Sequence, residues 1–329
     1  MAARPLDTRT VTALVTAATA APSLHNAQPW RFRCLTRTRT LELRADLDRA
    51  MPRTDPDNRG LHVGCGAALF NLRVAVAAAG RHADVQLLPV PADRLLLATV
   101  RIIDTDRPDR ELARCYPAID RRHTSRHPFE DRAVPPDVRD ALRAAAAREG
   151  AQLVFPDGWH VEALLDHIRD VEGRDSLDPV SSEDVHRWTR VGAEDTGTAV
   201  DGVPARAFGP AGRGGRAPVR DFAGRRAVPG RPTAVFEATP NLALLGTVHD
   251  RPADWLRAGQ AMERVLLLAV RNGLATSLTS HSLEQPDLRE LARDPASDMG
   301  FVHMILRLGY GPSGVVSPRR PVEQVLEIV

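Results

Sequence analysis

Two long helical patterns constrain the fold of this chain more than any other feature of its 329 residues. In residues 58–80, apolar side chains recur at helical spacing and Gly80 provides a C-terminal stop. Residues 252–273 repeat the pattern at a constant offset, so that Gly66-Ala67-Ala68-Leu69 aligns with Gly259-Gln260-Ala261-Met262 and Gly80 with Gly273. A strand is predicted after each helix, at 85–90 and 275–279. Two helices of similar pattern can arise by coincidence, so the repeat alone leaves a duplication open.

Further helices and strands are predicted on both sides of these two segments. Helices are expected at 8–21, 135–149, 159–171 and 182–191, and strands at 31–35, 40–44, 95–103, 151–155, 233–237, 242–247 and 301–308. Gly64 and Gly66 lie inside a helical pattern with no strand before them, so they indicate close helix packing rather than a dinucleotide-binding turn. Residues 201–232 are rich in Gly, Pro and Arg, which predicts either a disordered insertion or a functional lid.

The composition excludes several classes of protein. The formal net charge is +2 and every basic residue apart from histidine is arginine, which gives no indication of nucleic-acid binding. Three cysteines without a C-x-x-C pair are too few for a disulfide framework. No apolar run is expected to cross a membrane and no signal-peptide pattern opens the chain, so we expect a cytoplasmic protein without a membrane partner.

A polar turn at residues 22–30 follows the first predicted helix. Pro22 ends that helix, because proline lacks an N–H and disfavours helical geometry in the preceding residue. Ser23, His25, Asn26 and Gln28 then supply small hydrogen-bonding side chains, before Pro29 forces an extended exit. Such a segment can bind the edge of a flat heterocycle. It can equally be an ordinary helix-to-strand turn with local hydrogen bonds.

Arginine clusters occur at two other places in the chain. Arg121 and Arg122 precede Thr124, Ser125 and Arg126, a combination of guanidinium and hydroxyl donors that suits a phosphate. The alternative is a solvated basic turn. Arg319 and Arg320 lie in the C-terminal segment and would be unremarkable alone.

The pattern A-P-S-x-x-N-x-Q-P-W-[RH]-F in the first turn resembles the signature of the flavin-dependent nitroreductase superfamily. Residues 54–57, 64–69, 201–204 and 318–321 are similar to the Acg-type nitroreductase-like proteins of actinobacteria. The resemblance implies an α+β, nitroreductase-like fold and an FMN cofactor. It assigns the flavin contacts to Pro22, Ser23, Leu24, Asn26 and Gln28 in the turn, Arg122, Thr124 and Arg126 in an R-x-[ST]-x-[RK]-x-x-F motif, Ser280, His281 and Ser282 on the side of the flavin N5, and Arg319 and Arg320 at the phosphate.

The same resemblance gives the repeated helix a meaning. In the family, the long central helix lies at the dimer interface, so two such helices in one chain imply two fused copies that form an intramolecular pseudo-dimer. We expect a first half at 1–106 and a second half at 107–329, which carries the lid at about 201–232. The first half holds the turn and the second half holds the arginine motifs. We therefore expect one FMN per chain in a composite site between the halves, in a monomer or a homodimer.

Two functions remain open from the sequence. The first is an oxidoreductase in which NAD(P)H reduces bound FMN, and FMN passes electrons to a small-molecule acceptor. The alternative is a protein that stores or sequesters FMN, or senses redox state, beneath a lid and without nitroreductase turnover. No catalytic residue is identified: His25 and His281 are candidates for acids, although structural hydrogen bonding is the preferred explanation for both. No G-x-S-x-G elbow and no metal-binding spacing is present.

Overall fold

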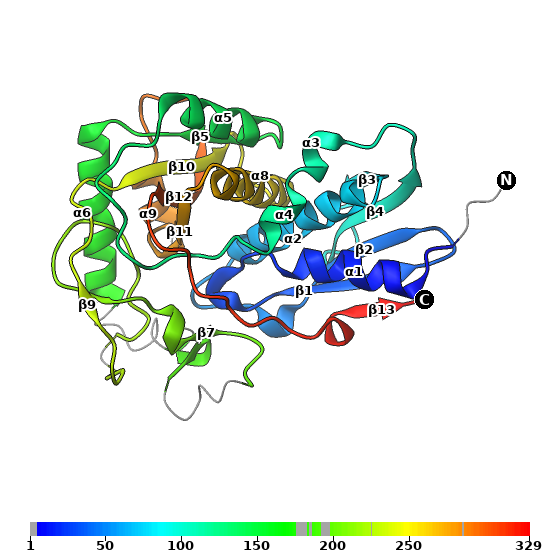
Figure 1. Ribbon diagram of the computed structural model, residues 1–329, viewed down its shortest axis with the longest axis horizontal. Helices are drawn as coiled ribbons and strands as arrows, with labels where there is room; N and C mark the ends of the chain where they lie inside the picture. The colour runs from blue at the N-terminus through cyan, green and yellow to red at the C-terminus, as the bar shows by residue number, and fades with distance from the viewer. Residues whose placement is uncertain (1–4, 176–182, 184–185, 192–197, 225, 285) are drawn as a thin grey trace.

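The computed structural model describes residues 5–175, 183, 186–191, 198–224, 226–284 and 286–329. Two β-sheets lie on either side of a central pair of long helices, α2 (Arg59–Ala78) and α8 (Pro252–Arg271) (Figure 1). Both helices have 20 residues, and both are predicted to within two residues at each end. The mixture of helices and largely antiparallel sheets agrees with the expected α+β class.

The first sheet has the strand order β13-β1-β2-β4-β3. It consists of β1 (Trp30–Leu35), β2 (Thr40–Ala45), β3 (Arg81–Leu87), β4 (Leu96–Asp104) and β13 (Leu326–Ile328). All neighbours pair antiparallel except β13, which lies parallel to β1 and was not predicted. Helix α1 (Thr8–Thr19) precedes the sheet, and its N-terminus is capped by the Asp7 carboxylate, which accepts a hydrogen bond from the Thr10 amide.

The second sheet has the order β11-β12-β10-β5 and is antiparallel throughout. It consists of β5 (Gln152–Val154), β10 (Asn241–Thr247), β11 (Ala275–Thr279) and β12 (Phe301–Gly309). Helices α5 (Pro136–Ala147), α6 (Gly158–Asp175) and α9 (Pro286–Leu291) belong to this half of the chain. Numbered by their order along the chain, these four strands are the first (β5), second (β10), third (β11) and fourth (β12). They lie side by side in the order first, second, fourth, third, and strands β1, β2, β4 and β3 of the first sheet have the same arrangement.

The two central helices approach each other at glycines. A Cβ atom placed on Gly66 would lie 2.3 Å from the Leu256 carbonyl oxygen, and one on Gly259 would lie 2.0 Å from the Val63 carbonyl oxygen. The expectation of close helix packing at Gly66 is therefore confirmed. Helix α2 is apolar and long enough to cross a membrane, which the sequence analysis did not anticipate, but 83% of its apolar window is buried inside the protein.

The remaining elements are short. Helices α3 (Arg110–Ala113) and α4 (Tyr116–Ile119) lie between β4 and α5 in the chain. Strands β6 (Thr189–Arg190) and β7 (Val203–Pro204) pair in parallel, as do β8 (Ala211–Gly212) and β9 (Thr233–Ala234). Single turns of 3₁₀ helix occur at η1 (Leu24–Asn26), η2 (Leu47–Arg49), η4 (Ala205–Ala207), η5 (His281–Leu283) and η6 (Val322–Gln324).

Three sequence expectations fit the structure less well. The helix expected at 182–191 falls partly outside the described residues, and its last part contains the strand β6. The strand expected at 233–237 is limited to β9. In 201–232, the described residues bury their own apolar cluster of Val203, Ala207, Phe208, Phe222 and Ala223, so a low apolar content did not prevent local packing.

Candidate functional site

The turn after α1 holds an unusual backbone. His25, Asn26 and Gln28 have φ angles of 46°, 58° and 55°, in the left-handed region that non-glycine residues seldom adopt. Such strain persists only where the surroundings enforce it, and it is concentrated at functional sites. Here the Gln28 amide donates to Ser23 Oγ at 2.9 Å, and Asn26 Nδ2 donates to the carbonyls of Gly202 and Pro318 at 3.0 and 3.1 Å. The turn is thus fixed by two segments distant in sequence.

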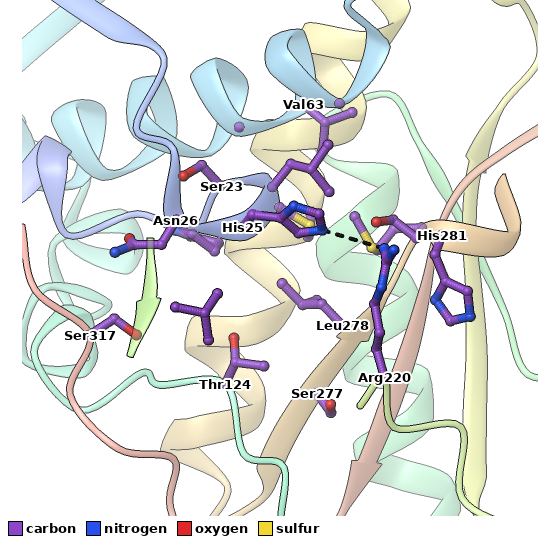
Figure 2. A pocket seen from close by; sticks show the side chains of 18 of the residues that line it. Ser23, His25, Asn26, Val63, Thr124, Arg220, Ser277, Leu278, His281 and Ser317 are labelled. Atoms are coloured by element: carbon purple, nitrogen blue, oxygen red, sulfur yellow. Dashed lines mark hydrogen bonds between the residues drawn. The ribbon is translucent and has the colours of Figure 1, made fainter. Parts of the chain in front are cut away.

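A cavity lies beside this turn (Figure 2). Its walls come from the turn, the N-terminal half of α2, the connection around residue 124, the end of β11 and the C-terminal segment. Most of the predicted flavin-contact residues line it: Pro22, Ser23, Leu24, Asn26, Arg122, Thr124, Arg126, Ser280, His281 and Arg319. The structure therefore brings together motifs from both ends and the middle of the chain.

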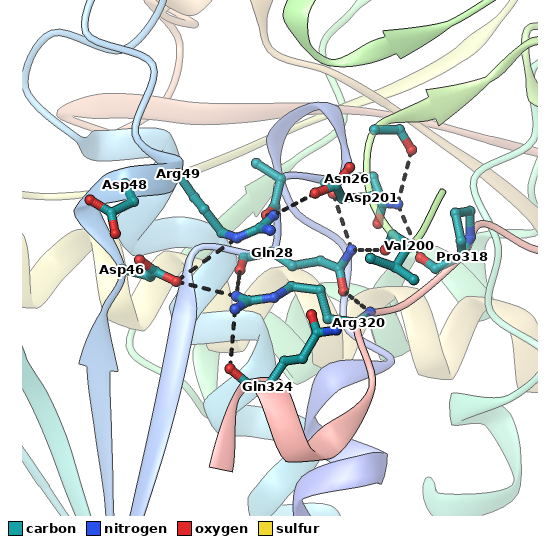
Figure 3. A network of polar contacts seen from close by, with 12 residues as sticks. Asn26, Gln28, Asp46, Asp48, Arg49, Val200, Asp201, Pro318, Arg320 and Gln324 are labelled. Atoms are coloured by element: carbon teal, nitrogen blue, oxygen red, sulfur yellow. Dashed lines mark hydrogen bonds and ion pairs between the residues drawn. The ribbon is translucent and has the colours of Figure 1, made fainter. Parts of the chain in front are cut away.

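Gln28, Ser282 and Arg320 are not among the residues that line the cavity. The buried Gln28 side chain accepts from the Arg320 amide at 2.8 Å and donates to the Val200 carbonyl at 2.8 Å. The Arg320 guanidinium lies 3.2 Å from Asp46 Oδ2 and also donates to the Gln324 carbonyl (Figure 3). Ser282 is fully buried in η5. In this structure Gln28 and Arg320 fasten the turn to the C-terminal segment.

Arg319 lines the cavity, but its donors bind protein carbonyls. Nε donates to the Thr19 carbonyl at 2.8 Å and Nη2 to those of Ala20 and Ala21 at 3.0 and 3.1 Å, while Nη1 donates to Asn26 Oδ1 at 3.0 Å. A cation at the C-terminal carbonyls of a helix is stabilised by the helix dipole. Burial lowers the pKa of Arg319 to about 9. The residue thus caps α1 and holds Asn26.

Arg122 and Arg126 give the lining of the cavity a positive charge. Arg126 donates to the Ala207 carbonyl at 2.9 Å and its guanidinium lies 4.8 Å from the centroid of the Phe222 ring. Burial lowers the pKa of Arg126 to about 10, and no ion pair joins it to a carboxylate in the described part of the chain. Thr124 and Ser317 also line the cavity, and their residue types supply hydroxyl groups. Such a donor set suits an anion.

The lining of the cavity also holds two imidazoles, His25 and His281, and Arg220. Arg220 Nη1 lies 3.3 Å from His25 Nε2 (Figure 2). The Arg220 guanidinium also lies 3.7 Å from the Glu284 carboxylate. Because arginine only donates, His25 Nε2 accepts, and the ring proton resides on Nδ1. Burial, with a smaller contribution from Arg220, lowers the pKa values of His25 and His281 well below their usual range. Both rings are therefore uncharged at neutral pH.

The start of α2 also contributes to the cavity, which the sequence analysis did not assign. Asp55 accepts from the amides of Gly60 and Leu61 at 2.9 Å each, and so caps the helix. Arg59 donates to the carbonyls of His303 and Leu283 at 2.7 and 2.9 Å. The resemblance already included residues 54–57 and 64–69, so that part of the pattern was an available signal.

Arg220, Phe222 and Ser317 were likewise missed as lining residues. Arg220 and Phe222 lie in the segment 201–232, which the sequence analysis treated as a possible lid without assigning a contact to any of its residues. Among the described residues, no group of three or more His, Cys, Asp or Glu side chains could hold a metal ion.

Comparison with known proteins gives the family. No family model matches the chain. It is 36% identical to "Putative NAD(P)H nitroreductase Rv3131" of Mycobacterium tuberculosis, over 98% of this chain and 92% of that protein. It is 31% identical to "Putative NAD(P)H nitroreductase acg" of the same organism, over 98% of this chain and 97% of that protein. A solved nitroreductase-like structure from Anabaena variabilis aligns with a TM-score of 0.47 and 12% identity, over 92% of this chain and 88% of that one. The chain belongs to the Acg-type family of nitroreductase-like proteins.

Proposed function

We propose that this protein is an FMN-binding, nitroreductase-like oxidoreductase with one FMN per chain and NAD(P)H as electron donor. The observation that carries the proposal is the cavity itself, with Arg122 and Arg126 in its lining and the strained turn at residues 22–28 beside it. FMN combines a phosphate with a flat ring whose edge carries polar atoms, so the donor set fits both parts of the molecule. The names of the two mycobacterial relatives support the same chemistry.

In this proposal the flavin supplies the electron transfer, and the protein supplies binding, orientation and access. Arg122, Thr124 and Arg126 hold the phosphate. Pro22, Ser23, Leu24 and Asn26 contact the ring system on one side, and Ser280 and His281 do so on the other. Arg319 acts by fixing Asn26 and the end of α1 rather than by offering further donors.

We further propose that the chain is an internal pseudo-dimer, with halves at 1–106 and 107–329. The same offset in residue number relates Arg59 to Pro252 and Ala78 to Arg271, so the first and last residues of α2 correspond to those of α8. This offset also relates Val63 to Leu256. The close contact of Gly66 with Leu256 therefore corresponds to the contact of Gly259 with Val63, with the two helices exchanged. Reciprocal contacts of this kind characterise a two-fold interface. The matching strand orders of the two sheets support the same conclusion.

A second candidate, an FMN-storing or redox-sensing protein, is favoured by residues 201–232. Val203, Val219, Arg220 and Phe222 of this segment line the cavity, and Phe222 contacts the His25 ring edge-on with 5.3 Å between centroids. A segment in this position would act as a lid that restricts access of a nicotinamide to the flavin.

One experiment on the purified protein tests these proposals. Flavin released by denaturation is quantified against protein, and the absorption spectrum is recorded anaerobically before and after addition of NADPH. We expect a ratio of about one flavin per chain. Bleaching followed by reoxidation with a nitroaromatic acceptor supports the enzyme, and bound flavin that NADPH fails to reduce supports the storage function. A protein that binds no FMN would refute both.

A further inference from the structure

A buried carboxylate lies next to Arg122, one of the residues that line the cavity. Glu263 of α8 has no solvent-exposed surface, and its Oε1 lies 3.4 Å from Nε of Arg122, which is itself 2% exposed. Neither oxygen of Glu263, nor Nε of Arg122, has a hydrogen-bond partner within the described residues. Asn71 of α2 is equally buried, and its side-chain amide lies close enough to Glu263 to oppose part of the rise in the pKa of that carboxyl.

The charges around Glu263 are few. Arg122 faces it from the connection after α4, Arg319 adds a weaker attraction from the C-terminal segment, and Asn71 of α2 contributes an uncharged amide. His123 lies beside both arginines, which together with burial lower its pKa. The next residue of α8, Arg264, pairs instead with Glu149 at 2.9 Å. Desolvation raises the pKa of Glu263, and Arg122 only partly opposes this.

Among the described residues, Glu263 is the one carboxylate that pairs with Arg122, so a phosphate that binds Arg122 must share the guanidinium with Glu263. A phosphate dianion at Arg122 would place two more negative charges near Glu263 in a region with little water. Like charges in such surroundings disfavour the ionised carboxylate strongly. The charged groups here are the Glu263 carboxylate and the guanidinium groups of Arg122 and Arg319. Arginine stays protonated, so Glu263 is the group that can lose its charge when a phosphate binds.

We propose that Glu263 takes up a proton from solvent when the phosphate of FMN binds at Arg122. Before binding, the carboxylate neutralises the guanidinium; after binding, the phosphate does so and Glu263 is a neutral carboxylic acid. The inference rests on the proposed FMN site and adds proton linkage to it. FMN affinity therefore falls as pH rises, by up to about tenfold per pH unit across the window in which Glu263 titrates.

The test compares FMN with riboflavin, which lacks the phosphate, in the wild-type protein and in Glu263→Gln. Calorimetric titrations in buffers of different ionisation enthalpy, between about pH 5.5 and 8.5, count the protons exchanged on binding. We expect wild type to take up as much as about one proton more than Glu263→Gln with FMN, and the two to agree with riboflavin. The ionisation of the FMN phosphate itself is common to both proteins and cancels in the difference.

Glu149→Gln is the matched control, because Glu149 is a buried carboxylate that pairs with Arg264 and does not line the cavity. It should bind FMN with the wild-type proton count. If Glu263→Gln does not fold, infrared difference spectra of the wild type serve instead: FMN should produce a new carboxylic-acid band that riboflavin does not. Equal proton counts for wild type and Glu263→Gln, or no new band, would overturn the linkage. Failure of FMN to bind the wild type would instead refute the proposed cofactor.

Discussion

Gly66 of α2 and Gly259 of α8 face each other where the two central helices cross. A Cβ atom on Gly66 would lie 3.0 Å from the Cα of Gly259, and one on Gly259 would lie 2.9 Å from the Cα of Gly66. The backbone carbonyls of Leu256 and Val63 lie closer still to these positions. The helices can therefore pack at this distance only if neither position carries a side chain.

The first prediction is that Gly66→Ala and Gly259→Ala each destabilise the protein by about 1–3 kcal/mol, because a methyl group must push backbone apart. Urea denaturation measures the change. Gly158→Ala is the matched control, since Gly158 begins α6 and a Cβ there has no neighbour within 4 Å. Alanine variants as stable as the control would show that the crossing adjusts without cost.

The second prediction separates the arginines by their partners. Arg126→Ala should weaken FMN binding by about tenfold to a hundredfold, because a charge-assisted hydrogen bond contributes about 1.5–3 kcal/mol. Riboflavin binding should change little. Arg320→Ala should weaken both ligands equally, by loosening the contacts with Asp46 and Gln28. Flavin fluorescence titration measures all four affinities, and a loss for FMN and riboflavin alike in Arg126→Ala would contradict a phosphate role.

The third prediction concerns the stability of the folded protein in mildly acidic solution. Burial lowers the pKa values of His25, His281 and His303 below 6.5, so the unfolded chain binds more protons than the folded protein in mildly acidic solution. Stability conferred by these neutral rings is present above pH 6.5 and decreases as the pH falls, by up to about 1.4 kcal/mol per pH unit for each ring.

Denaturation curves between about pH 5 and 8 test this expectation. His281→Gln should show a shallower loss of stability in acid than wild type. The exposed His82 provides the control, and His82→Gln should follow the wild-type curve. A slope unchanged in His281→Gln would argue against a buried neutral imidazole.

The fourth prediction addresses access to the cavity. Arg220→Gln removes the ion pair with Glu284 and weakens the contact with His25, so the segment at 201–232 should open more readily. FMN should stay bound, and its anaerobic reduction by NADPH, followed by stopped-flow absorbance, should become faster. Arg213→Gln alters an exposed arginine of the same segment and should leave the rate unchanged. An unaltered rate in Arg220→Gln would remove the case for a lid.

The sequence predicted regular elements better than the directions of side chains. Strand β11 and the central helices follow from apolar periodicity, which is a local property. Strand β13 has three residues and pairs with β1 from the other end of the chain, so no local pattern indicates it. Phe208 and Phe222 pack together inside a segment with little other apolar content.

Adjacent arginines show the same limit. Arg319 and Arg320 have the same chemistry, yet the first turns to the carbonyls at the end of α1 and the second to Asp46. Which neighbour faces the cavity depends on how the C-terminal segment crosses the turn, and that crossing is a tertiary property. Glu263 is an acidic residue of α8, and nothing in the neighbouring sequence indicates its partner. That partner, Arg122, lies far away in the sequence.

The parallel pairing of β13 with β1 has a consequence for biosynthesis. The segment that supplies Ser317 and Arg319 to the cavity lies immediately before this strand, so the ribosome makes it after all the other residues that line the cavity. The turn at residues 22–28 is made early in translation. Its hydrogen bonds to Pro318 and Arg319 can form only after these two residues have been made. A nascent chain can therefore pair β1, β2, β3 and β4 and still be unable to retain the cofactor until Arg319 has been made.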